Sequence, residues 1–260
     1  MIYITEFIII FFFFYLSYLI NLRFKNFDQP GKDKIHKTKV LTSGGLIPFF
    51  FLSLILFFII YFDNFIYSDY FLNIPQLWMA PITILILLFI SFFDDLNYIP
   101  FQLRLFLQLI LVYLCISLFP VNQDYSFQTP IFDGLLPLKI DIIITIILWT
   151  FIINSTNFID GYDGMFSFQI ITNFFALSII FFMINEIFHF KVSILVLFIG
   201  ILFLPFNFGK KFKMYIGDAG SIPSGFVLGW MLISLINMGY YLSAILINFL
   251  FLADVVVTLI

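Results

Sequence analysis

The sequence predicts an all-α integral membrane protein: a polytopic helical bundle of about nine transmembrane helices, forming one domain over residues 1–260. Two observations lead to this fold class. Hydrophobic residues make up 63% of the chain, charged residues only 10%, and the mean hydropathy is +1.12, a balance that excludes a soluble domain. The apolar residues also form runs of about 20, the length that crosses a bilayer as a helix.

Nine such runs follow one another along the chain. The first lacks a basic leader and a small-residue cleavage site, so we predict a retained helix rather than a signal peptide. His189 falls between two runs, where we expect a solvated loop histidine. The predicted spans are residues 2–22, 46–62, 76–93, 100–119, 139–155, 165–184, 192–208, 222–239 and 242–260.

Basic residues gather on one side of this topology. With the N-terminus outside, the outer segments hold only Lys139 and Lys191. An excess of lysine and arginine marks the cytoplasmic side, so we predict that the inner segments are cytoplasmic. Those segments hold Arg23, Lys25, Lys32, Lys34, Lys37, Lys39, Arg104, Lys210, Lys211 and Lys213.

Four short polar clusters interrupt the apolar chain, at residues 28–36, 93–95, 154–164 and 214–221. Each lies at the end of an apolar run, and all four fall on the predicted cytoplasmic side. Carboxylates are costly so close to hydrocarbon, so their repeated placement at one face predicts a shared site. Carboxylates, asparagines and glycines together suit magnesium and a phosphorylated substrate.

The second cluster ends in two adjacent acids, Asp94 and Asp95. Arg104 and Gln108 follow, four residues apart and therefore on one face of the next helix. The paired carboxylates can hold magnesium, orient a nucleophile or accept a proton. A polar anchor for the loop is the alternative.

The third cluster carries Asn154 and Asn157 at a helix end, then Asp160 and Asp163, each followed by glycine. The amide oxygens suit a hard cation or sugar hydroxyls, and the glycines allow a ligand to approach the backbone closely. A calcium EF-hand is excluded, because its spacing and its glutamate at position 12 are absent. A plain tight turn remains the alternative.

The fourth cluster, Gly217 to Ser221, directly precedes a predicted helix. We expect Ser221 to cap that helix and its free amides to receive phosphate oxygens, while Asp218 holds a metal ion. The first cluster is basic and contains Lys34 and His36. Contact with anionic lipid headgroups is its alternative role.

These clusters, in this order, resemble the polyprenyl-phosphate N-acetylhexosamine-1-phosphate transferases of glycosyl transferase family 4. The resemblance covers about residues 28–254. It includes Asp28-x-Pro30 with Lys34-x-His36, Gly44-Gly45, Asp94-Asp95, Arg104 with Gln108, Asn154-x-x-Asn157-x-x-Asp160-Gly-x-Asp163-Gly, and Gly217-Asp218-x-Gly220-Ser221.

The resemblance implies a magnesium-dependent phosphoglycosyl transferase, with Mn²⁺ as the alternative ion. A polyprenyl (undecaprenyl) phosphate oxygen attacks the β-phosphate of a UDP-N-acetylhexosamine and UMP leaves, which initiates a cell-envelope glycan such as the O-antigen of lipopolysaccharide. The implied residues are Asp94, Asp95, Asp160 and Asp163 in catalysis, Lys34, His36, Arg104, Asn154 and Gly217 in substrate binding, and Asn157 and Asp218 as metal ligands.

The resemblance further implies a multi-pass protein of the bacterial inner membrane with its site on the cytoplasmic face. No nucleic acid is expected as a partner, and a homodimer is left open. The family continues into a further cytoplasmic loop, so we expect this chain to be C-terminally incomplete. Two other functions stay open: a membrane transporter or lipid flippase, and an inactive truncated remnant of the enzyme.

Overall fold

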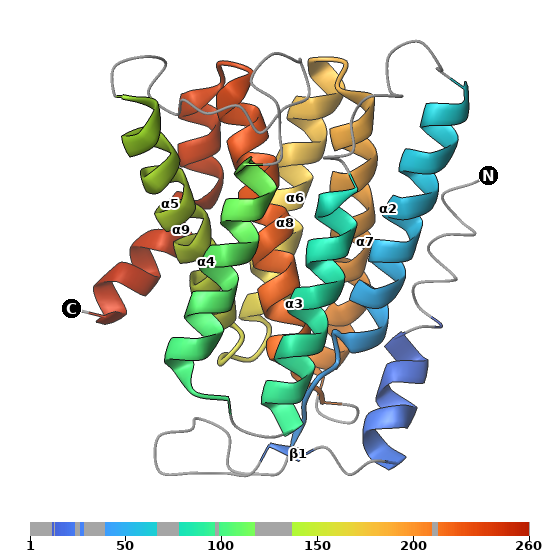
Figure 1. The fold of residues 1–260 in the computed structure, drawn as a ribbon. Coiled ribbons are helices and arrows are strands. Elements are labelled where there is room, and N and C mark those ends of the chain that lie inside the picture. The colour runs from blue at the N-terminus through green and yellow to red at the C-terminus, as the bar shows by residue number, and fades with distance from the viewer. Residues whose placement is uncertain are drawn as a thin grey trace.

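The computed structural model describes residues 12, 14–23, 27–28, 40–66, 78–96, 99–117, 137–209 and 213–259. Residues 14–23 form a helix, and eight further helices follow in these ranges (Figure 1). They are α2 (Leu46–Ile66), α3 (Met79–Leu96), α4 (Phe101–Ser117), α5 (Leu138–Ile159), α6 (Met165–Met183), α7 (Ile187–Phe208), α8 (Asp218–Asn237) and α9 (Tyr241–Leu259).

Six helices in the described part of the chain are long and apolar enough to cross a membrane, namely α3, α5, α6, α7, α8 and α9. The apolar stretches of α2 and α4 are shorter, Leu46–Tyr61 and Phe101–Ser117. At about 1.5 Å per residue they reach less than the thickness of a hydrocarbon core. The prediction of about nine spanning helices is therefore too high, and most of the first predicted span lies outside the described residues.

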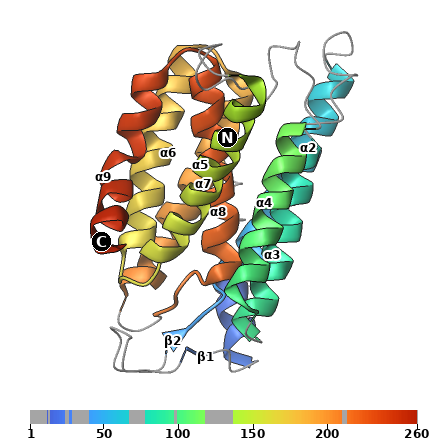
Figure 2. The ribbon, with the colours of Figure 1, turned by 60° about the vertical axis from the view of Figure 1, so that its left-hand side comes forward.

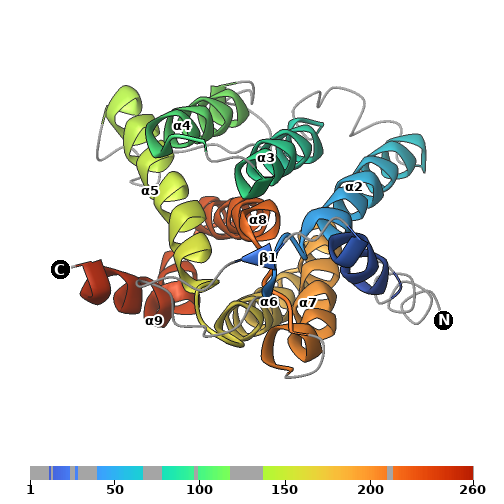
Figure 3. The same ribbon diagram turned by 90° about the horizontal axis from the view of Figure 1, so that it is seen from below.

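Helix α8 lies in the middle of the bundle, and α9 lies at its edge (Figure 3). Every residue of α8 from Ala219 to Leu235 is buried. Small residues allow this close packing: the indole of Trp149 on α5 lies against Gly229, stacks on Phe226 at 5.0 Å and donates its N–H to the carbonyl of Phe226 at 2.9 Å. The core therefore forms around α8, and its first turn is held within the bundle.

The outer surface of the bundle is apolar, as a lipid-facing surface requires. Phe182, Leu250 and Val257 are exposed large side chains on the peripheral helices α6 and α9. The helices α2, α3 and α4 form one side of the molecule when it is turned (Figure 2). Composition alone predicted this membrane class, and the described helices agree with it.

A short antiparallel pair of strands, β1 (Phe27–Asp28) and β2 (Val40–Leu41), lies at one end of the bundle beyond the helices (Figure 1). Phe27 pairs with Leu41, and Leu41 also forms a parallel bridge to Met214. These strands were not predicted from the sequence. They bring the segment that follows β2 against the chain that leads into α8.

Helix α7 begins well before its predicted start. It begins at Ile187 rather than 192, so His189 lies on a helix. Its ring is buried, stacks on Phe181 at 5.0 Å, and its Nδ1 lies 3.3 Å from Glu186. The prediction of a solvated loop histidine is therefore wrong, because aromatic packing buries a side chain that polarity alone would leave in water.

Candidate functional site

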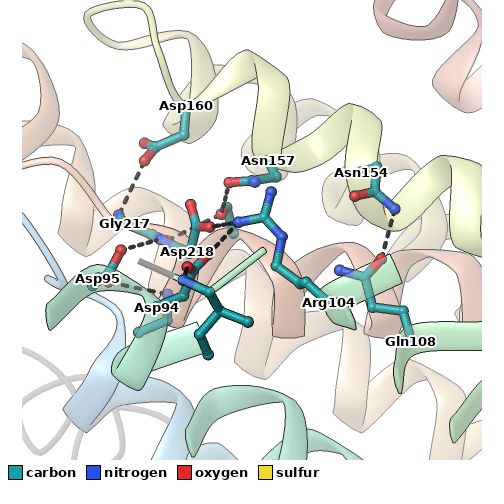
Figure 4. Close-up of polar contacts among 12 residues, drawn as sticks. Asp94, Asp95, Arg104, Gln108, Asn154, Asn157, Asp160, Gly217 and Asp218 are labelled. Carbon is teal, nitrogen blue, oxygen red and sulfur yellow. Dashed lines mark hydrogen bonds and ion pairs between the residues drawn. The ribbon is translucent and has the colours of Figure 1, made fainter. Parts of the chain in front are cut away.

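Segments far apart in the sequence meet at the end of the bundle that carries β1 and β2. The chain after β2 runs beside the chain before α8: Gly44 N donates to Tyr215 O at 3.1 Å, and Gly45 N donates to Ile216 O at 2.9 Å. The last turn of α3, the start of α4 and the end of α5 complete the site (Figure 4). The structure thus brings acids from three predicted clusters together.

The first turn of α8 is held by two carboxylates. Asp218 N and Ala219 N donate to the carboxylate of Asp95 at 3.2 and 3.4 Å, and Gly217 N donates to Asp160 Oδ2 at 3.0 Å. Gly217 adopts φ +72°, a left-handed conformation that glycine tolerates without strain. The amides expected to be free for phosphate are therefore occupied by protein carboxylates in this structure.

Ser221 lies inside α8 and does not cap it, so that prediction is wrong. The cap position is Gly217, four residues earlier. The first amides of α8 donate to a carboxylate on another helix, Asp95 of α3, and not to a side chain near them in the sequence. The hydroxyl of Ser221 lies 2.7 Å from Asn157 Oδ1 and 3.0 Å from Gly217 O. It links α8 to α5 beside the predicted metal ligand Asn157.

Arg104 on α4 is the cation at the centre of the site. Its Nη1 lies 2.5 Å from Asp94 Oδ2 and also contacts Asp218 Oδ2. Asp94 Oδ1 accepts a hydrogen bond from Ile99 N at 2.7 Å, which fixes the turn between α3 and α4. The guanidinium therefore joins helices α3, α4 and α8 through their charges (Figure 4).

Asn154 lies one helical turn before Asn157 on α5 and contacts α4. Its Nδ2 donates to Gln108 Oε1 at 2.7 Å and to Thr150 O at 2.8 Å. Arg104 and Gln108 thus point toward α5 and α8 from one face of α4, as their spacing predicted.

Asp160 is buried at the end of α5, just outside the apolar part of that helix. Burial raises the pKa of its carboxyl from 3.8 to about 7, because ionisation is unfavourable away from water. The hydrogen bond from Gly217 N opposes this effect, and the nearby charge of Asp218 adds to it. Burial thus favours the protonated form of the Asp160 carboxyl over its ionised form.

Asp163 does not join the acids at the start of α8. Its side chain is half exposed, lies 2.6 Å from Lys213 Nζ and accepts a hydrogen bond from Tyr215 OH at 3.0 Å. Its implied role in catalysis stays a prediction. Lys34 and His36 lie outside the described residues.

Three residues of the site were not found from the sequence: Ser43, Lys213 and Tyr215. Ser43 donates a 2.5 Å hydrogen bond to Asp95 Oδ2, and the other two hold Asp163. The only signal in the sequence was their position: Ser43 precedes Gly44-Gly45, Lys213 precedes the fourth cluster, and Tyr215 lies within it.

The site residues fit magnesium in ligand chemistry. Asp94, Asp95 and Asp218 bring three carboxyl groups to one place, and among the described side chains Arg104 is the cation that contacts two of them, Asp94 and Asp218. Hard divalent cations prefer oxygen ligands of this kind. In the arrangement described, the acids bind Arg104 and backbone amides instead, and no three of the described histidines, cysteines or acids are placed as a metal-binding group.

The family model described as glycosyl transferase family 4 matches residues 77–236. The match covers more than half of the chain and extends from α3 to the end of α8, so it contains every acid of the site. It confirms the family resemblance seen in the motifs. None of the curated proteins compared with the chain matches it.

Proposed function

The chain belongs to glycosyl transferase family 4, and on that premise we propose that it transfers N-acetylhexosamine 1-phosphate from a UDP-sugar to a polyprenyl phosphate. Family membership and the apolar helices support a membrane-embedded sugar-phosphate transferase of the polyprenyl-phosphate type. The specific sugar donor, the release of UMP, the cytoplasmic face of a bacterial inner membrane and a role in envelope glycan synthesis are parts of the proposal.

The observation that carries the proposal is the meeting of three acids and one guanidinium at one end of an apolar bundle. Asp94, Asp218 and Arg104 come from α3, α8 and α4, and Asp95 lies directly beside them. A phosphoryl transfer between a lipid and a nucleotide sugar needs this position, because the lipid chain lies in hydrocarbon while both phosphates remain at the membrane surface. A transporter would instead place its polar groups near the middle of the bilayer.

In the proposed reaction, an oxygen of the polyprenyl phosphate forms a bond to the β-phosphorus of the UDP-sugar. The bond from that phosphorus to the bridging oxygen breaks, and UMP leaves with the electron pair. Arg104 is placed to neutralise phosphate charge, and one acid of the Asp94–Asp95 pair is placed to orient the attacking phosphate or to take its proton.

Magnesium is part of the proposal. Asp218 and Asn157 would hold it, and it would neutralise the diphosphate charge that develops during transfer. Asn157 lies next to α8 through Ser221, so both proposed ligands already face the same end of the bundle.

The test is transfer from labelled UDP-GlcNAc to undecaprenyl phosphate, together with exchange of labelled UMP, in membranes that contain the protein. Asp218→Ala should lower the rate by at least about a hundredfold, because it removes a charged group at a phosphoryl-transfer centre. Glu186→Gln is the control, since Glu186 precedes α7 at the other end of the bundle. Equal small effects of both substitutions would contradict the assignment, and no transfer or exchange by the unchanged protein would contradict the function.

A further inference from the structure

We infer that Ser43 is a positioning residue of the proposed transfer reaction. Its hydroxyl holds the Asp95 carboxylate against the first turn of α8, and it acts through that carboxylate rather than by touching a substrate. The kinetic part of the inference rests on the proposed function. The geometric part, that the hydroxyl orders the start of α8, stands separately.

Ser43 is fixed from several directions. Its side chain is fully buried between β2 and α2, and its Oγ donates to Asp95 Oδ2 at 2.5 Å. Its carbonyl oxygen accepts hydrogen bonds from Asn21 Nδ2 at 3.1 Å and from Leu46 N at 3.3 Å. These contacts hold the backbone of Ser43 in place, so its hydroxyl reaches the Asp95 carboxylate from a fixed position.

Asp95 passes this constraint to α8. One of its carboxylate oxygens accepts from the Ser43 hydroxyl and from Ala219 N, and the other accepts from Asp218 N. Asp218 is the residue whose side chain meets Arg104 in the centre of the site. Rotation of the Asp95 carboxylate would therefore move the backbone that carries the proposed metal ligand.

The backbone of Ser43 is strained. It adopts φ +60°, a left-handed conformation that non-glycine residues rarely occupy. Such strain persists where the surrounding structure requires it, and it concentrates at functional sites. Glycine would relieve the strain at this position but would remove the hydroxyl. Serine, unlike glycine, supplies the hydroxyl that contacts Asp95. The same carboxylate is also packed against Gly217: a Cβ placed on Gly217 would lie 2.8 Å from Asp95 Oδ2.

Three substitutions separate the hydroxyl from the strain. Ser43→Gly removes both, Ser43→Ala removes only the hydroxyl, and Ser43→Thr keeps the hydroxyl while adding a β-branched methyl group that increases strain. Thermal stability should therefore be higher for Ser43→Gly than for Ser43→Thr. Activity should follow the opposite order, because only threonine still holds Asp95.

The first readout is kinetic. Ser43→Gly and Ser43→Ala should each lower kcat about tenfold to a hundredfold with little change in KM, as expected when a charged hydrogen bond that positions a reacting group is lost. Ser43→Thr should retain more of the wild-type kcat than either. If kcat instead follows stability across the three variants, Ser43 is only structural and the inference is wrong.

The second readout is hydrogen exchange of the peptide that contains residues 214–222, measured without substrates. The amides of Asp218 and Ala219 should exchange faster in Ser43→Gly and Ser43→Ala than in the wild type, and Ser43→Thr should stay closer to the wild type. Unchanged exchange in the glycine and alanine variants would overturn the inference whether or not the protein is active. Absent transfer by the wild type, with the expected exchange pattern, would contradict the proposed function alone.

Discussion

Asp94 and Asp95 are neighbours in the sequence, yet they have different partners in the structure. Asp94 binds the Arg104 guanidinium and the amide of Ile99, whereas Asp95 binds the Ser43 hydroxyl and the amides that begin α8. On a helix, consecutive side chains point about 100° apart, so two adjacent acids reach different elements. In this pair of acids, Asp94 therefore binds a cationic side chain, and Asp95 binds backbone amides at the start of α8.

At the residue scale, Asp160→Asn should change how stability depends on pH. Because burial raises the pKa of Asp160 from 3.8 to about 7, its contribution to folding stability is fully present below about pH 4 and is lost as the pH rises through about 7. Asparagine keeps an oxygen to accept from Gly217 N and cannot ionise. The variant should gain stability relative to the wild type as the pH rises, by up to about 4 kcal/mol.

The measurement for Asp160→Asn is the melting temperature of both proteins in detergent between pH 4.5 and 7.5. The difference between variant and wild type should grow in favour of the variant across that range. A difference that is constant with pH would show that the Asp160 carboxyl titrates near its ordinary value in the folded protein.

At the element scale, the chain that follows β2 meets α8 through two glycines. A Cβ placed on Gly45 would collide with the backbone of Gly220, and one placed on Gly220 would lie 2.8 Å from the Cα of Gly45. This approach allows Gly44 N and Gly45 N to donate to Tyr215 O and Ile216 O. The Gly44-Gly45 pair of the sequence therefore allows its backbone to contact the chain at the start of α8. A larger residue at Gly45 would prevent this contact.

Gly45→Ala should therefore separate this segment from α8 and lower both stability and transfer activity. A forced overpacking of this kind costs about 1–3 kcal/mol, so the melting temperature should fall by several degrees. Gly161→Ala is the matched control, because its Cβ would meet only Phe158 O at 3.5 Å, an ordinary contact. Equal losses in the two variants would show that the Gly45–Gly220 contact has no special role.

At the scale of the whole molecule, the polar site lies at one end of the bundle and the α8–α9 turn lies at the other. Tyr162 and Tyr240 mark these two ends, and both side chains are exposed. Cys115 is the only cysteine in the sequence, and it is buried. Single introduced cysteines can therefore report which end faces the cytoplasm.

Tyr162→Cys should react with a membrane-impermeant maleimide only from the cytoplasmic side, and Tyr240→Cys only from the outside. The reason is the predicted excess of lysine and arginine on the side of the polar clusters. The measurement compares intact cells with inverted membrane vesicles. Labelling of Tyr162→Cys in intact cells would show that the orientation is the reverse of the predicted one and that the site lies on the outer face.

Local chemistry made much of the protein predictable from its sequence. Hydropathy is a sum over neighbouring residues, so it identified the membrane class and the approximate course of α2 to α9. The motifs from Asp94 to Ser221 identified the family, which the family model confirms over residues 77–236. The spacing of Arg104 and Gln108 predicted the shared face that the structure shows.

Only the tertiary structure decided which of these polar groups meet. Asp95 and Asp160 reach the amides at the start of α8, Ser43 reaches Asp95, and Asp163 turns away to Lys213. Each of these contacts joins residues about 50 or more positions apart, so no local pattern could have predicted them. The start of α8 at Asp218 has the same cause, because its amides are satisfied by carboxylates that the packing of other helices brings there.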